Sequence, residues 1–200
     1  MSTRPILDVS RLPRFAFGAK SILWWGTMGI VAIEGTMFAI LIASYFYLRT
    51  RSTEWPPGVL DPYMLWGGIN MVLVLVSEIP NIWLKGVANR LDLAKVRVGL
   101  VIVTVLGLAT LVIRAFEFPA LRAAWSVNAY TSVAWTLLGF HTVHLLTDWV
   151  DTVVLTVLMF VGPIERKRFV DVSENADYWT FVVLTWIPVF ATLYLAPRYL

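Results

Sequence analysis

Five long apolar stretches constrain the fold of this chain more than any other feature of its 200 residues. Each stretch is long enough to cross a hydrocarbon core of about 30 Å as a helix. A helix satisfies its backbone hydrogen bonds internally, which lipid requires of any spanning segment. The stretches run approximately over residues 22–48, 64–84, 98–118, 129–161 and 179–195.

The composition supports a membrane protein, because hydrophobic residues make up 58% of the chain and charged residues only 14%. The connections between the stretches are too short for a soluble domain. We therefore expect one all-α integral membrane domain, residues 1–200, built as a bundle of five transmembrane helices. The net charge of +3 is spread over short patches between the apolar stretches, which argues against a nucleic-acid partner.

The distribution of basic residues predicts the orientation of the bundle. Residues 1–20 lack the apolar core and cleavage site of a secretory signal, so we expect a retained tail. This tail and the second and fourth connections together hold eleven Lys and Arg, whereas the opposite side holds five. The positive-inside rule then places the N-terminus in the cytoplasm and the C-terminus outside. The expected location is the inner membrane of a bacterial cell, as a multi-pass protein.

The supply of metal ligands is small, since the chain has no cysteine and two histidines. The lack of cysteine excludes disulfides, thiolate metal sites and thiol catalysis. A carboxylate di-iron bundle needs two Glu-x-x-His motifs on different helices, and none is present. The two histidines point the same way from one helix, so they cannot ligate opposite faces of one haem. We expect no catalytic, cofactor or metal site in this chain.

Both histidines lie on one polar stripe of the fourth apolar stretch. His141 and His144 are three residues apart, and Asp148 and Asp151 continue the stripe at helical spacing. Ionisable groups at membrane depth are rare, and each is a candidate functional residue. We expect the stripe to face protein, water or a polar lipid group.

Helix geometry places several ionisable groups at one depth. At about 1.5 Å per residue, positions on three helices reach the middle of the bilayer. A charge there costs on the order of 2.5–3.5 kcal/mol, so the groups should be paired. A static hydrogen-bonded layer, a proton-active role and a role in binding a lipid headgroup all remain open. The candidate residues of this buried polar layer are Glu34, Glu78, Glu117, His141 and His144.

Three further features lie near predicted helix ends. Arg114 and Glu117 are one turn apart, which predicts an ion pair at the membrane edge. Trp179 stands at the start of the fifth stretch, where an indole favours the headgroup level. A basic run next to the membrane either contacts lipid headgroups or only sets the topology, and its residues are Arg166, Lys167 and Arg168.

Four motifs, in the same order along the chain, are similar to those of one known family. They are Trp24-Trp25-Gly26 with Glu34 and Tyr45-Phe46-Tyr47-Leu48-Arg49; Arg97 with Ala115-Phe116-Glu117-Phe118; Gly139-Phe140-His141-x-x-His144; and Tyr178-Trp179-Thr180-Phe181-Val182-Val183. Together they resemble subunit III of the haem–copper respiratory oxidases, the cytochrome c oxidase family, in its five-helix bacterial form. The Gly-Phe-His-x-x-His motif is the most specific of the four.

The resemblance implies a non-catalytic subunit of a terminal oxidase. In that family subunit III packs against subunit I, which holds the haems and copper, in a complex with subunit II. It binds phospholipid and supports proton uptake and turnover stability during oxygen reduction. The chain would then belong to a proton-translocating oxidoreductase of the aerobic respiratory chain without carrying a redox centre. Its partners would be subunit I, subunit II and membrane lipids.

Some positions depart from the family pattern. Thr180 and Val183 stand where the family usually has His and Asp, and Arg114 stands where it usually has glutamine. Glu78, Asp148 and Asp151 are additional polar residues in this comparison. Family roles that depend on the polar groups of the last helix therefore cannot be transferred.

Other functions remain open from the sequence. One is an accessory subunit of a nitric oxide reductase, whose small relatives share these motifs. Another is a small proton-coupled carrier that uses the polar layer as a relay, although the sequence lacks internal repeats and broken helices. A third is a scaffold in which the layer only sets helix register. For the oxidase, we expect Glu34, His141 and His144 to form a cluster that orders a lipid or tunes the interface with subunit I.

Overall fold

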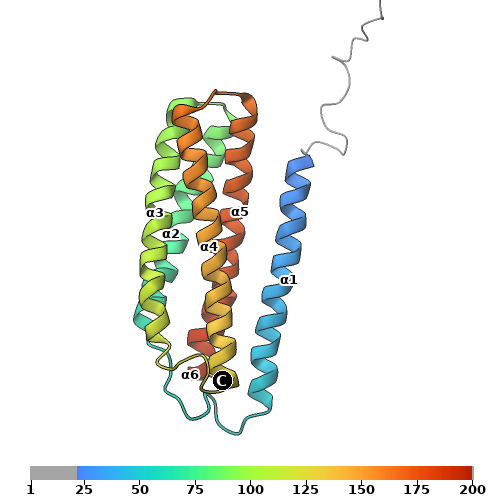
Figure 1. Ribbon diagram of the computed structural model, residues 1–200, viewed down its shortest axis with the longest axis vertical. Helices are drawn as coiled ribbons and strands as arrows, with labels where there is room; N and C mark the ends of the chain where they lie inside the picture. Colours follow the sequence, from blue (N-terminus) through green and yellow to red (C-terminus); the bar gives the residue numbers. More distant parts are fainter. Residues whose placement is uncertain (1–21, 200) are drawn as a thin grey trace, which may run out of the picture.

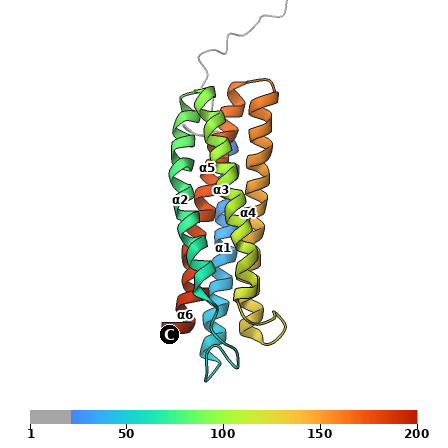
Figure 2. The ribbon, with the colours of Figure 1, turned by 90° about the vertical axis from the view of Figure 1, so that its left-hand side faces the viewer.

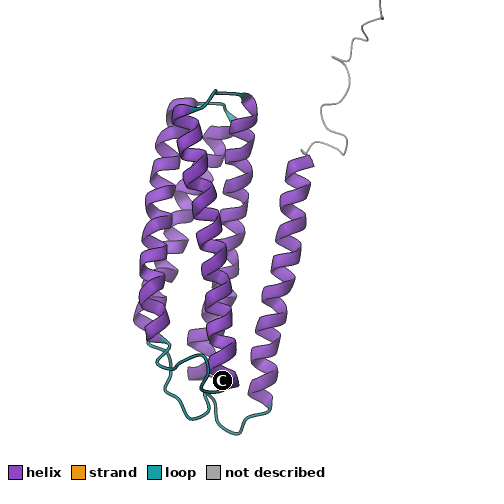
Figure 3. Cartoon of the chain, viewed as in Figure 1, coloured by secondary structure: helices purple, strands orange, loops and turns teal. Residues whose placement is uncertain are grey.

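The computed structural model describes residues 22–199, which form helices joined by short loops, with no strand among them (Figure 3). Five helices are long and apolar enough to span a membrane, so the predicted all-α class is confirmed. The tail predicted over residues 1–20 lies outside the described residues. The helices are α1 (Ile22–Thr50), α2 (Met64–Asn89), α3 (Leu93–Ala120), α4 (Ala129–Val161) and α5 (Arg166–Phe190), followed by the π-helical turn η1 (Ala191–Leu195) and α6 (Ala196–Tyr199).

Helices α2 to α5 form an antiparallel bundle, and α1 lies along one side of it, against α4 and α5 (Figures 1 and 2). The α2–α3 and α4–α5 connections share one end of the bundle, where the basic residues of both predicted cytoplasmic connections lie. Only Phe38 and Tyr45 of α1 are buried. Because α1 contacts the bundle along one edge, most of its surface is open to lipid or to another subunit.

Side-chain caps fix the starts of α3 and α4. Asp92 accepts a hydrogen bond from the Lys95 backbone N–H at 3.2 Å. The Lys95 side chain and this backbone bond lower the pKa of Asp92, so the cap is anionic at neutral pH. At α4, Asn128 and Thr131 form a reciprocal capping box, with hydrogen bonds of 2.9 and 3.1 Å. These caps place the α4 start at Ala129, as the sequence predicts.

Helix α5 corrects the predicted connection over residues 162–178. The helix begins at Arg166, far ahead of the predicted start at Trp179. Phe169, Val172 and Ala176 follow helical spacing and are buried against the bundle. Apolar length alone could not reveal this segment, because its other faces are polar and it extends beyond the apolar layer.

The bundle has two apolar cores with polar side chains between them. The larger core surrounds Trp186 and Tyr194, and the smaller one surrounds Leu100 and Met159. The band between them contains buried or half-buried polar residues from α2, α4 and α5: Ser77, Glu78, Asn81, Asp148, Thr152 and Asn175. Buried polar groups need partners, so this band is where specific pairing is concentrated.

Candidate functional site

Helix α5 organises the polar band by pointing successive side chains at different helices. The Tyr178 hydroxyl donates to Glu34 Oε2 on α1 at 2.7 Å. The Thr180 hydroxyl donates to Glu78 Oε1 on α2, also at 2.7 Å. Residues two apart on a helix lie on nearly opposite sides. Glu34 and Glu78 therefore lie at a similar level along the bundle, but α5 separates them into two groups.

Glu34 and His144 form the first group. Glu34 Oε1 lies 3.4 Å from His144 Nε2, and His144 Nδ1 lies 2.6 Å from the Phe140 carbonyl oxygen. A carbonyl only accepts, so Nδ1 carries a proton. Nε2 is therefore the nitrogen that faces the Glu34 carboxyl group, and the pair bridges α1 and α4.

Arg114, Glu117 and His141 form a second group inside the larger core. Arg114 Nη1 donates to Glu117 Oε2 at 2.5 Å, and Nη2 lies 3.1 Å from His141 Nδ1. A guanidinium only donates, so Nδ1 accepts and the proton of His141 is on Nε2, which donates to the Val182 carbonyl at 3.0 Å. The guanidinium also stacks 3.8 Å from the Trp186 ring centroid. His141 is thereby held neutral with both nitrogens engaged.

The structure thus divides the cluster expected for Glu34 and the two histidines. His144 meets Glu34, whereas His141 meets Arg114, and the Phe38 ring lies against both imidazoles. The physical reason is that α4 packs between α1 and α3, so a three-residue offset on α4 is enough to change the neighbour.

The predicted ion pair of Arg114 and Glu117 is present and fully buried within the bundle. The side chains of Arg114 and Glu117 are 1% and 0% exposed. Their side of α3 faces α4 and α5, and α3 continues past them to Ala120. The predicted partner of Arg114 is correct, and the bundle buries the pair completely.

Glu78 has a partner for each carboxylate oxygen. Oε1 accepts from Thr180, and Oε2 accepts from Asn81 Nδ2 at 3.1 Å. The same amide also donates to the Ala176 carbonyl at 2.9 Å. Thr180, which departs from the family pattern, therefore binds Glu78, which departs from it too.

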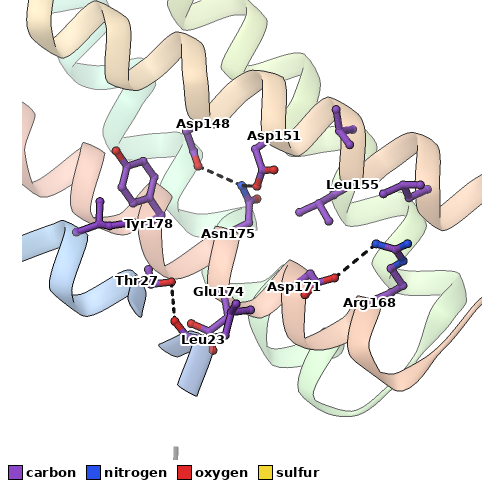
Figure 4. Close-up of a pocket in the computed structure, with 13 residues that line it drawn as sticks. Leu23, Thr27, Asp148, Asp151, Leu155, Arg168, Asp171, Glu174, Asn175 and Tyr178 are labelled. Carbon is purple, nitrogen blue, oxygen red and sulfur yellow. Dashed lines mark hydrogen bonds and ion pairs between the residues drawn. The ribbon is translucent and has the colours of Figure 1, made fainter. Parts of the chain in front are cut away.

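Asp148 and Asp151 share one amide. Asn175 Nδ2 lies 3.1 Å from Asp148 Oδ1 and 3.1 Å from Asp151 Oδ2 (Figure 4). Thr152 Oγ1 donates to Asn175 Oδ1 at 3.1 Å, which fixes the orientation of the amide. Sequence reasoning missed Asn175 because it placed that residue in a connection, and it named Tyr178 in a family motif without giving it a role in the site. The helical spacing of the buried apolar residues of α5 was the signal that could have found them.

The residues expected to contact lipid headgroups divide into two cases. Arg166 and Lys167 are exposed at the bundle end, and Arg168 lies 3.7 Å from Asp171. Trp179 was expected at the headgroup level, but it is 6% exposed and its Nε1 donates to Ser77 Oγ at 3.1 Å. The earlier start of α5 moves Trp179 into the bundle interior.

We expect Trp179→Phe to destabilise the protein by about 1 kcal/mol, because it removes a buried hydrogen bond to Ser77. The measurement is reversible unfolding in mixed micelles. Trp125→Phe is the matched control, since Trp125 is 64% exposed and its replacement should change little. Equal effects of the two substitutions would contradict the buried position of Trp179.

The described residues suit proton and hydrogen-bond chemistry. Among residues 22–199 no three His, Asp or Glu side chains are grouped to hold a metal ion. Each polar group instead joins two or three helices through defined donors and acceptors. Such groups can position helices, hold a proton or bind a polar ligand.

Fold and site together define a multi-pass membrane protein with paired polar groups in its interior. It is similar to cytochrome c oxidase subunit 3 of Thermostichus vulcanus, with 24% identity over 87% of each chain. It is 26% identical to subunit 3 of Synechocystis sp., over 89% of this chain and 77% of that one. It is 27% identical to the probable cytochrome c oxidase subunit 3 of Nocardia farcinica, over 84% of this chain and 85% of that one.

These relatives confirm the resemblance to the oxidase subunit III family. Relatives with the same name also occur in eukaryotes, including Triticum aestivum. No family model matches the chain.

Proposed function

We propose that this chain is the non-catalytic subunit III of a terminal haem–copper oxidase in a bacterial inner membrane. In this role it packs against subunit I, in a complex with subunit II, binds phospholipid and supports proton uptake and turnover stability during oxygen reduction. The haems and copper belong to the partner subunits. The observation that carries the proposal is similarity to oxidase subunits over at least 84% of this chain.

The geometry of the two histidine groups favours a non-catalytic role in positioning the helices. His141 is neutral and engaged at both nitrogens, so it fixes α3, α4 and α5 relative to one another. The Glu34–His144 pair lies at the edge where α1 meets the bundle. This pair can respond to a neighbouring lipid or subunit, because Glu34 is half-buried and α1 is largely open.

A proton relay through this chain alone receives less support. The Glu34–His144 and Glu78–Thr180 groups lie on nearly opposite sides of α5, and His141 has no free nitrogen.

Co-purification identifies the partner directly: a haem–copper subunit is expected to accompany the full chain. Oxygen consumption is expected of that complex, whereas nitric oxide consumption would identify a reductase. Proton-coupled transport by the purified chain in liposomes would instead favour a carrier.

We expect Glu34→Gln and His144→Asn to leave complex assembly intact but to reduce the number of turnovers that the oxidase completes before it inactivates. Glu34→Gln keeps the shape of the side chain but removes the carboxyl group, and His144→Asn removes the Nε2 that faces Glu34. The readouts are oxygen consumption over successive turnovers and phospholipid content. Glu54→Gln, the same change at an exposed loop position, is the control. Turnover decay and lipid content equal to those of the control would leave the pair with only a scaffold role.

A further inference from the structure

A pocket of about 400 Å³ lies between α1, α4 and α5, in the half of the bundle that contains the start of α5 (Figure 4). Among the described residues that line it, one guanidinium, that of Arg168, faces three carboxyl groups, those of Asp148, Asp151 and Asp171. Arg168 also lies 3.7 Å from Asp171, so its charge is already engaged. The described part of the lining therefore has an excess of carboxyl groups and favours a cation.

Asp148 gives this pocket an unsatisfied acceptor. The residue is 3% exposed, and its Oδ1 accepts from Asn175. Its Oδ2 is buried without a hydrogen-bond partner in the described part of the chain. Asn175 cannot supply a second donor there, because it also binds Asp151 and its amide is oriented by Thr152. A buried acceptor without a donor is costly, so the pocket lacks a donating group next to Asp148.

The remaining walls restrict what such a donor can be attached to. Leu23 and Ile30 of α1 face Val154 and Leu155 of α4 across the pocket and make it largely apolar away from the carboxyl groups. A ligand that fits has a small cationic head with several N–H donors and an apolar or methylene stem. A primary ammonium has three donors and no acceptor, whereas a quaternary ammonium has no donor.

We propose that this pocket binds a primary ammonium group, with Asp148 and Asp151 as its acceptors. The ammonium can belong to an aminophospholipid such as phosphatidylethanolamine or to a free alkyl amine. Both sources share the chemistry that the pocket recognises. This site specifies the headgroup of the lipid that the proposed function includes. It rests on the proposed function only for the location in a membrane. It does not require an oxidase partner.

The test measures lipid binding by the full chain, with any subunits that purify with it, in nanodiscs. The lipids are phosphatidylethanolamine, phosphatidylcholine or phosphatidylglycerol in a neutral background, and binding is followed by native mass spectrometry. Phosphatidylethanolamine should bind roughly tenfold more tightly than phosphatidylcholine, because the choline head cannot donate to Asp148. Competition by free ethanolamine or spermidine, with no preference among the lipids, would identify a free amine as the ligand and still supports the ammonium site.

Two variants locate the effect in the pocket. Asp148→Asn combined with Asp151→Asn should abolish the preference, whereas Asp92→Asn, outside the pocket, should preserve it. Ile30→Trp should also abolish it by filling the pocket from α1, and because Ile30 is 50% exposed this change does not disturb the core. Equal affinity for all three lipids with no amine competition, displacement by Mg²⁺ alone, or a preference unchanged in both variants would overturn the proposal. Loss of the preference in a chain that still purifies with its partner leaves the proposed function standing.

Discussion

Replacing Arg114 with methionine is expected to lower the free energy of unfolding by about 3–5 kcal/mol, because it leaves Glu117 as an uncompensated buried carboxyl. Arg114 donates to both Glu117 and His141 and stacks on Trp186, so its loss affects three neighbours at once. The Glu117 carboxyl group and the His141 imidazole are both buried in the bundle, so neither can form a replacement hydrogen bond with water. Reversible unfolding in mixed micelles measures the loss directly.

The double variant Arg114→Met with Glu117→Gln separates charge from packing. Replacing both members of a buried ion pair is often close to neutral, so most of the lost stability should return. Arg51→Met, the same substitution at an exposed position, is expected to stay within about 0.5 kcal/mol of the original protein. If Arg114→Met were as mild as this control, the ion pair would have to be open to water and its burial would be contradicted.

The membrane helices were predictable because lipid imposes a simple condition on the sequence. Residues 129–161 are apolar over a long run, and the structure gives a helix with those bounds. The start of α5 obeys a different condition, since Phe169 and Val172 are buried on one face while polar residues occupy the others. Hydropathy averaged over a window cancels such a pattern, whereas helical spacing preserves it.

The polar residues were predictable as a group and not as pairs. Depth follows from position along each helix, so Glu34, Glu78 and His144 were expected at one level. Partners depend on how each helix is rotated about its axis, which one sequence does not fix. This is why His141 could not be separated from His144, and why Asn175 was missed between Asp148 and Asp151.

The contact between α2 and η1 leads to the second large effect, that of Gly67→Ala. A Cβ at Gly67 would lie 2.4 Å from Cζ of Tyr194, well inside contact distance. Tyr194 is fully buried and its ring packs 5.1 Å from the Phe190 ring centroid, so it cannot move aside. Overpacking of this kind costs about 1–3 kcal/mol, and the same unfolding measurement in mixed micelles should detect it.

The adjacent glycine supplies the control for this prediction. A Cβ at Gly68 meets no atom within 4 Å, so Gly68→Ala should raise stability by up to about 1 kcal/mol through helix propensity alone. Both substitutions gain the same propensity within α2, and the difference between them isolates the clash with Tyr194. Gly67→Ala combined with Tyr194→Leu should recover part of the loss, because the smaller side chain vacates the space that the ring fills. If Gly67→Ala and Gly68→Ala were equally stable, α2 could not pack as closely on η1 as the structure has it.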